Sequence, residues 1–148
     1  MKKLALVAAV GLALVGCGGS THSTRRSSHV PLVVPLRGHV RLQPGRARFL
    51  SPTRLAIATM GSSSCPSVTD RLVVVNRDAI RIHLVTGSWR RTQLVAKPPA
   101  SGACTADWGA TAMAVAIDPS RVDVHRRLTI RLYYPGSTKP GTLTAPPL

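Results

Sequence analysis

RLVVVNRDAIRIHL, residues 71–84, is the stretch that decides the fold. Its first half is an apolar run rich in β-branched side chains, which predicts a strand buried on both faces or crossing the core. Its second half alternates, so Ile80 and its period-two neighbours face inward while Arg81 and His83 face outward. Residues 76–78, Asn-Arg-Asp, suit a tight connection, and the whole stretch is therefore predicted to be a β-hairpin.

Strand-like patterns recur on both sides of this hairpin. The clearest are at 55–59, 113–117 and 128–134, with shorter candidates at 30–34, 39–43, 89–95 and 142–144. The alanines in 112–116 would also suit a helix, but Val115 and Ile117 recur at period two and favour a strand. About six to eight short strands with frequent turn signals predict an all-β, immunoglobulin-like sandwich, with a small β-barrel as the alternative.

The chain begins with Met1-Lys2-Lys3 and an apolar run that ends at LVGC, residues 14–17. A charged start, an apolar stretch shorter than the roughly 20 residues of a spanning helix, and small residues before a cysteine indicate an export signal. LVGC resembles the lipobox of bacterial lipoproteins. The resemblance implies that Cys17 carries diacylglycerol and becomes the first mature residue, whereas in an ordinary secretory signal Cys17 would be incidental.

The expected domain organisation follows from this signal. Residues 1–16 are predicted to be the lipoprotein signal peptide, 17–29 a flexible basic tether, and 30–148 one β-sandwich domain. The tether is rich in Gly, Ser, Thr and Arg and has almost nothing to bury. We expect a monomer held by the lipid on Cys17 at the extracytoplasmic face of the cell membrane.

The charge is strongly one-sided, because 20 Lys and Arg face only five acidic residues and give a formal net charge of +15. A potential of this sign attracts polyanions. Outside a bacterial membrane these are anionic lipid headgroups and wall polymers, and the export signal argues against a dedicated nucleic-acid role. Codon drift in a GC-rich genome is an alternative source of the arginines.

Cys65 and Cys104 remain once Cys17 is assigned to lipid. Two cysteines in an exported protein most often form a disulfide. A metal site or a catalytic thiol is the weaker interpretation, because no CxxC spacing is present. A disulfide here would join two loops at one end of the sandwich.

Asp123 and His125 are the nearest approach to a catalytic or metal-binding pair. If the chain is extended there, both side chains lie on one face, as an envelope enzyme or metal-binding protein would need. No third ligand follows at a metal-site spacing, and the chain contains no Glu and no GxSxG motif. The sequence therefore predicts no metal, no cofactor and no enzymatic activity.

Arginines beside aromatic residues are the candidate binding residues. Arg side chains pair with phosphate or carboxylate groups, and aromatic rings add stacking. The candidates for an anionic ligand are Trp89, Arg90, Arg91, Arg126 and Arg127, with Arg81 and Arg131 on outward faces of strands. Merely solvated arginines and a partly buried Trp89 are the alternative.

Trp108 is expected to pack against the disulfide. Because the chain has only five aromatic residues, a broad carbohydrate-binding platform of exposed rings is disfavoured.

The segments GSSSCP at 61–66 and ACTAD at 103–107, with Thr111 four residues further on, carry a second resemblance. They are similar to paired segments in small, uncharacterised exported or lipid-anchored proteins of high-GC Gram-positive bacteria, over residues 50–134. The resemblance implies a pairing of Cys65 with Cys104, a β-rich domain and residence at the bacterial surface, and it implies no catalytic residue. The resulting hypothesis is a non-catalytic, lipid-anchored module that binds an anionic envelope component or a protein partner.

Overall fold

A computed structural model of the protein describes residues 34–35, 42–91 and 93–148, the first two by their backbone alone. The predicted signal peptide at 1–16, the tether at 17–29 and Cys17 lie outside these residues. Residues 30–33 and 39–41, which make up most of two candidate strands, also lie outside the described residues.

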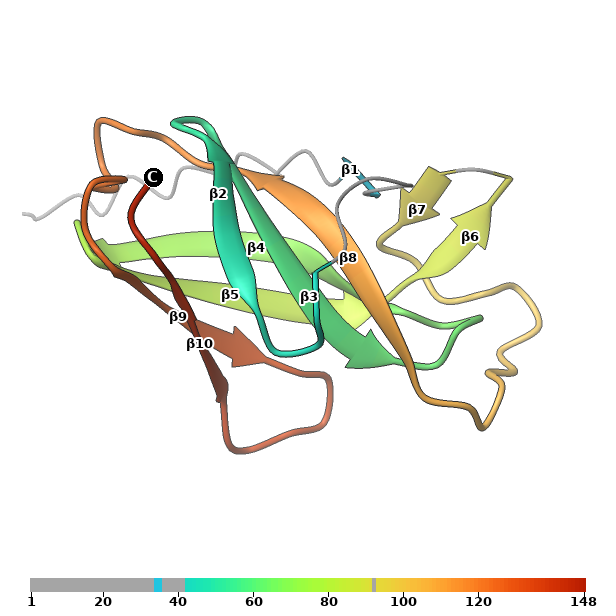
Figure 1. Ribbon diagram of the computed structural model, residues 1–148. Helices are drawn as coiled ribbons and strands as arrows, with labels where there is room; N and C mark the ends of the chain where they lie inside the picture. The colour runs from blue at the N-terminus through green and yellow to red at the C-terminus, as the bar shows by residue number, and fades with distance from the viewer. Residues whose placement is uncertain (1–33, 36–41, 92) are drawn as a thin grey trace, which may run out of the picture.

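The described residues form strands and no helix (Figure 1). The strands are β1 Val34–Pro35, β2 Ala47–Ser51, β3 Arg54–Gly61, β4 Ser67–Asn76, β5 Ala79–Thr86, β6 Ser88–Arg90, β7 Gln93–Val95, β8 Gly109–Ala116, β9 Leu128–Tyr133 and β10 Gly141–Ala145. Nothing in this part of the chain is a helix long and apolar enough to cross a membrane. The predicted all-β fold is confirmed.

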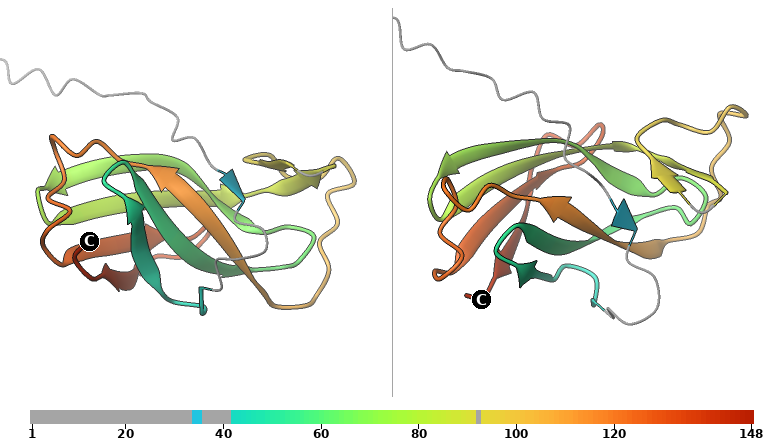
Figure 2. Two further views of the ribbon diagram at one scale, coloured as in Figure 1. Left: turned by 45° about the horizontal axis from the view of Figure 1, so that its top comes forward. Right: turned by 90° about the horizontal axis from the view of Figure 1, so that it is seen from above.

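Two four-stranded sheets pack face to face and form a sandwich (Figure 2). The first sheet has the order β1-β8-β3-β2, the second has the order β10-β9-β5-β4, and β6 and β7 form a separate hairpin. Neither sheet closes into a barrel. All pairings are antiparallel except that of β5 with β9, which is parallel because β6, β7 and β8 intervene before the chain returns beside β5.

The core lies between the sheets and is built by alternate residues of the longer strands. Its largest fully buried side chains include Leu55 and Ile57 of β3, Ile80 and Ile82 of β5, Met113 and Val115 of β8, and Ile130 and Leu132 of β9. The predicted inward side of the second half of the hairpin is therefore confirmed. The segment 109–116 is a strand, as its Val and Met spacing favours, and not the helix that its alanines would permit.

The prediction for the apolar run 71–76 was wrong in one respect. β4 is not buried on both faces, because the outer face of the second sheet is open to solvent. Leu72 and Val74 pack against the core, whereas Val73 and Val75 remain 39% and 49% exposed. An unbroken apolar run does not by itself show whether the outer face of a strand is covered or open to solvent.

Two further corrections concern short elements. β2 was not predicted, although its Ala47 and Phe49 alternate and are buried. The single strand expected at 89–95 is a hairpin of β6 and β7, in which Arg91 has a φ of 56° and the chain reverses. Such three-residue strands are too short for periodicity to reveal.

Candidate functional site

Five side chains of three neighbouring strands lie together on the outer side of the second sheet. Arg81 of β5 pairs with Arg131 of β9, and His83 pairs with Arg71 of β4 on one side and with Tyr133 of β9 on the other. Adjacent strands are about 4.8 Å apart, and residues two apart on a strand share a face. We call these five residues the arginine face. All three arginines are exposed to solvent.

His83 and Tyr133 form the aromatic part of the arginine face. Their rings are stacked, with centroids 4.9 Å apart and an angle of 12° between the planes. Partial burial is the main cause that lowers the pKa of His83 below 6.5, and the positive charges of Arg71 and Arg81 lower it further, while Asp70 opposes them. At neutral pH the uncharged imidazole is thus the favoured form of His83 when no ligand is bound to the arginine face.

The arrangement suits the binding of an anion. Guanidinium groups bind phosphate and carboxylate in a planar, two-pronged geometry, and three of them on one face can contact several charges of a polymer. The stacked rings offer a flat apolar surface next to these charges. His83 and Tyr133 are the two members of the arginine face that are not permanently charged, and they lie beside the three guanidinium groups.

The five residues singled out as anionic-ligand candidates do not form one surface. Trp89, Arg90 and Arg91 lie on the β6–β7 hairpin. Arg126 and Arg127 lie in the connection from β8 to β9, at the opposite end of the sandwich (Figures 1 and 2). The two basic pairs therefore cannot contact one small ligand.

Asp123 and His125 lie between β8 and β9, in a segment of turns and bends and not on the extended strand that the catalytic pair assumed. Val122 and Val124 are buried there, whereas Asp123 is half-buried and His125 is exposed. The Asp123 carboxylate accepts the backbone N–H of His125 at 3.1 Å and contacts Arg126 Nε at 3.6 Å. Asp123 thus stabilises a turn. In the part of the chain that the structure describes, no three His, Cys, Asp or Glu side chains are grouped as a metal site would need.

The disulfide joins Cys65, between β3 and β4, to Cys104, between β7 and β8. Their Cα atoms are 5.5 Å apart, and both loops lie at the end of the sandwich that carries the β6–β7 hairpin (Figure 1). The predicted pairing and the predicted joining of two loops at one end are both confirmed.

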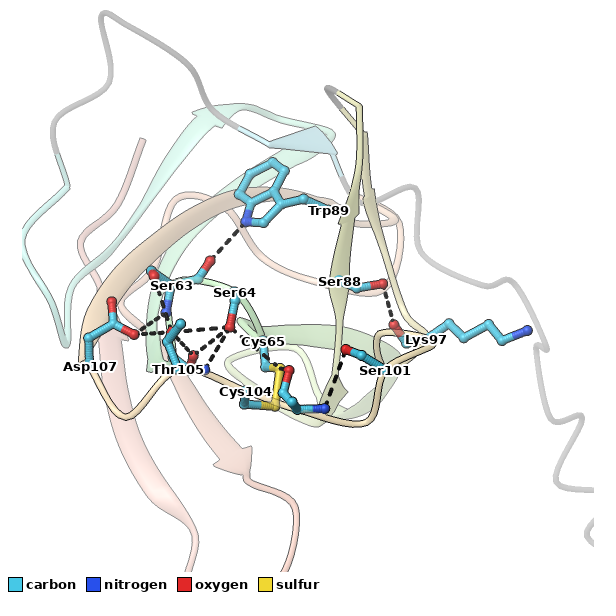
Figure 3. The surroundings of a disulfide bond; sticks show 12 residues. Ser63, Ser64, Cys65, Ser88, Trp89, Lys97, Ser101, Cys104, Thr105 and Asp107 are labelled. Carbon is cyan, nitrogen blue, oxygen red and sulfur yellow. Dashed lines mark hydrogen bonds between the residues drawn. A yellow bond between two sulfur atoms is a disulfide. The ribbon is translucent and has the colours of Figure 1, made fainter.

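Hydroxyl groups surround this disulfide (Figure 3). Thr105 Oγ1 lies 2.8 Å from Ser62 Oγ and 3.1 Å from Ser64 Oγ, and it donates to Asp107 Oδ1. Ser63 connects the cluster to Trp89, because its N–H donates to Asp107 Oδ1 at 3.4 Å and its carbonyl accepts the indole Nε1–H at 3.2 Å. Hydrogen bonding lowers the pKa of the Asp107 carboxyl, with the largest effect from the Ser63 side chain, followed by the Thr105 side chain.

Trp108 corrects another expectation. It does not pack against the disulfide but is 78% exposed, directly after Asp107. Trp89 is 39% exposed and is held by Ser63. Both tryptophans therefore lie at the disulfide end, on segments that contact Ser63 from two sides.

Arg71 and Tyr133 were absent from the sequence-based candidates. Arg81 and Arg131 were recognised as outward-facing, and the same alternation places Tyr133 outward. The missing signal is the parallel pairing of β5 with β9, which brings Arg81, Arg131 and Tyr133 side by side. Comparison with known proteins yields no match to a protein-family model, to a curated protein or to a solved structure.

Proposed function

We propose that this protein is a lipid-anchored extracytoplasmic module, without catalytic activity, that binds an anionic component of the cell envelope through the arginine face. The observation that carries the proposal is the register of β4, β5 and β9, which sets Arg71, Arg81 and Arg131 on one solvent-facing surface around the His83–Tyr133 stack.

The electrostatics of the arginine face favour an anionic ligand. Like charges on neighbouring strands repel one another, and an anion placed between them replaces repulsion with attraction. Because the arginines are exposed, salt screens both effects over about 8 Å at physiological ionic strength. Binding should therefore be strong at low salt and weaken steeply as salt rises.

The proposed anchor on Cys17 supports this function by raising the local concentration. A module tethered to a membrane meets envelope polymers at a high effective concentration, so a modest intrinsic affinity suffices. The anchor is tested separately by replacing Cys17 with Ser in the producing cell. The substituted protein should lose the lipid that the parent carries, measured by metabolic labelling with a fatty acid, and a parent that takes up no label would contradict the lipobox prediction.

Binding is tested with the full chain carrying Cys17→Ser, sedimented with native envelope fragments across a salt series. One variant also carries Arg71→Gln, Arg81→Gln and Arg131→Gln. A control of equal charge carries Arg90→Gln, Arg91→Gln and Arg127→Gln. Inorganic polyphosphate serves as the soluble competitor.

The proposal expects salt-sensitive sedimentation that polyphosphate competes away, and a loss of binding in the arginine-face variant that is much larger than in the control. Equal losses in both variants would show that total charge and not the arginine face is responsible. Capture that salt does not weaken would favour a protein partner instead, and no capture would overturn the binding function.

A further inference from the structure

Trp108 is an exposed aromatic residue for which the fold supplies no reason. An indole is one of the largest apolar side chains, and one left 78% exposed keeps most of that apolar surface in water. Trp108 is not among the residues that form the hydrophobic core or pack against it. Large exposed apolar groups with polar neighbours are typical of ligand-binding surfaces.

The residues that precede Trp108 in the sequence, Thr105 and Asp107, are polar and are hydrogen-bonded to the loop at 62–64. Thr105 Oγ1 and the Ser63 N–H both donate to Asp107 Oδ1, and the Ser63 side chain also stabilises the negative carboxylate (Figure 3). The backbone N–H of Thr105 donates to Ser64 Oγ at 2.9 Å, which joins the two disulfide-linked loops a second time. A carboxylate oxygen and several hydroxyls are thus presented by a cross-linked platform, which reduces the entropy lost on binding.

We propose that the disulfide end contains a binding site for a neutral saccharide unit. In this site the apolar C–H face of one sugar ring stacks on the Trp108 indole, and sugar hydroxyls donate to the Asp107 carboxylate. The hydroxyls of Ser62 and Ser63 can donate or accept, as a sugar hydroxyl also can. One ring and one carboxylate fit a single sugar unit, which differs from the broad aromatic platform that the composition disfavours.

The charge at this position selects against an anionic ligand. Asp107 is exposed, and the hydrogen bonds from Ser63 and Thr105 keep its pKa below the usual value, so the carboxylate is negative at neutral pH. A negative group beside Trp108 repels an anionic lipid surface or an acidic sugar, whereas a neutral sugar donates hydrogen bonds to it. The proposal thus names a second ligand class on residues that the arginine face does not share.

The two tryptophans of the chain allow a direct test by fluorescence. The full chain with Cys17→Ser and Trp89→Phe retains Trp108 as its sole tryptophan, and its emission is followed as neutral oligosaccharides of glucose, galactose, mannose and arabinose are added. The chain with Cys17→Ser and Trp108→Phe reports on Trp89 instead. Because Trp89→Phe removes the bond to Ser63, a glycan array of the protein with both tryptophans serves as an independent measurement.

The proposal expects a saturable blue shift of Trp108 emission with at least one neutral saccharide. Trp108→Ala should weaken binding by about tenfold or more, which corresponds to roughly 1.4 kcal/mol, without changing the melting temperature. Asp107→Asn should also weaken it, while both variants retain sedimentation through the arginine face. No saturable response in either measurement would overturn the site, as would a response to anionic phospholipid vesicles in place of sugars.

Discussion

His83 makes the stability of the domain depend on pH. Burial and the charges of Arg71 and Arg81 lower its pKa below 6.5, so the unfolded chain binds a proton more readily than the folded one. The contribution of neutral His83 to the free energy of unfolding is fully present above about pH 6.5. It is lost as the pH falls through the lower pKa of His83 in the folded state. The melting temperature should therefore fall below about pH 6.5, and His83→Phe should flatten the curve in this window.

Tyr133→Phe is the control, because it keeps the ring that stacks on His83. It should retain the pH dependence of the parent. A parent curve that does not fall between neutral pH and the onset of carboxylate protonation would contradict this account. Because a bound anion favours protonated imidazole and so raises the pKa of His83 in the folded state, inorganic polyphosphate should make the fall of the melting temperature smaller in the parent but not in His83→Phe.

Thr59 shows that one hydroxyl can be essential to the core. Its side chain is fully buried on β3, and Oγ1 donates to the carbonyl of Ser67 at 2.7 Å. Thr59→Val keeps the shape but leaves that carbonyl without this donor, which should cost about 1–3 kcal/mol of unfolding free energy. Urea denaturation measures the loss. Thr142→Val on the exposed side of β10 is the matched control and should be nearly neutral.

At the scale of elements, the sequence predicted the long alternating strands and missed the features that depend on their neighbours. β5 and β9 were clear because four or more residues alternate in each. The exposed outer face of β4 was not clear from the sequence, because Val73 and Val75 are as apolar as buried residues. The turn at Arg91 was also missed, since a left-handed φ at a residue other than glycine has no reliable signature.

The connection between β5 and β6 depends on Gly87. A Cβ atom there would lie 2.8 Å from both Cγ atoms of Val68 and 2.8 Å from the carbonyl oxygen of Val95. Gly87 also donates its N–H to the carbonyl of Pro66 at 2.8 Å, so the backbone cannot move away without losing a hydrogen bond. Gly87→Ala should therefore destabilise the domain by about 1–3 kcal/mol, through overpacking.

Gly109→Ala is the matched control for this glycine. Its added Cβ would meet no atom closer than 3.8 Å, which is ordinary van der Waals contact. Differential scanning calorimetry should show a lower melting temperature for Gly87→Ala and little change for Gly109→Ala. Equal melting temperatures for the two variants would contradict the steric account.

At the scale of the whole molecule, alternation predicted that Arg81 and Arg131 face outward but could not predict that they are neighbours. Their adjacency follows from a parallel pairing across residues that are 50 positions apart, after three intervening strands. Two alternating strands can be placed in a sheet in several orders without changing which side chains are buried. The arginine face is therefore a property of topology, whereas the disulfide was predictable because only two cysteines remained after Cys17.

The disulfide is the only covalent link across the sandwich end among the described residues, and its removal tests how much the small core needs it. Cys65 and Cys104 are 39 positions apart, and closing a loop of that length stabilises the fold by about 4 kcal/mol in the chain-entropy account. This is a large share of the roughly 5–15 kcal/mol by which domains are stable. Cys65→Ala with Cys104→Ala should lower the unfolding free energy by about this amount in urea.

The same double variant separates the two proposed binding surfaces. Without the cross-link, the loops that carry Ser62 to Ser64 and Thr105 to Asp107 are held by hydrogen bonds alone, so saccharide binding should weaken even where the domain is still folded. The arginine face lies on β4, β5 and β9, whose ladders do not include either cysteine, and its binding to envelope fragments should persist under those conditions. The comparison uses sedimentation and fluorescence measurements on one sample, whose folding is verified by circular dichroism. Equal loss of both activities in that folded sample would show that the two surfaces are coupled through the sandwich and are not independent sites.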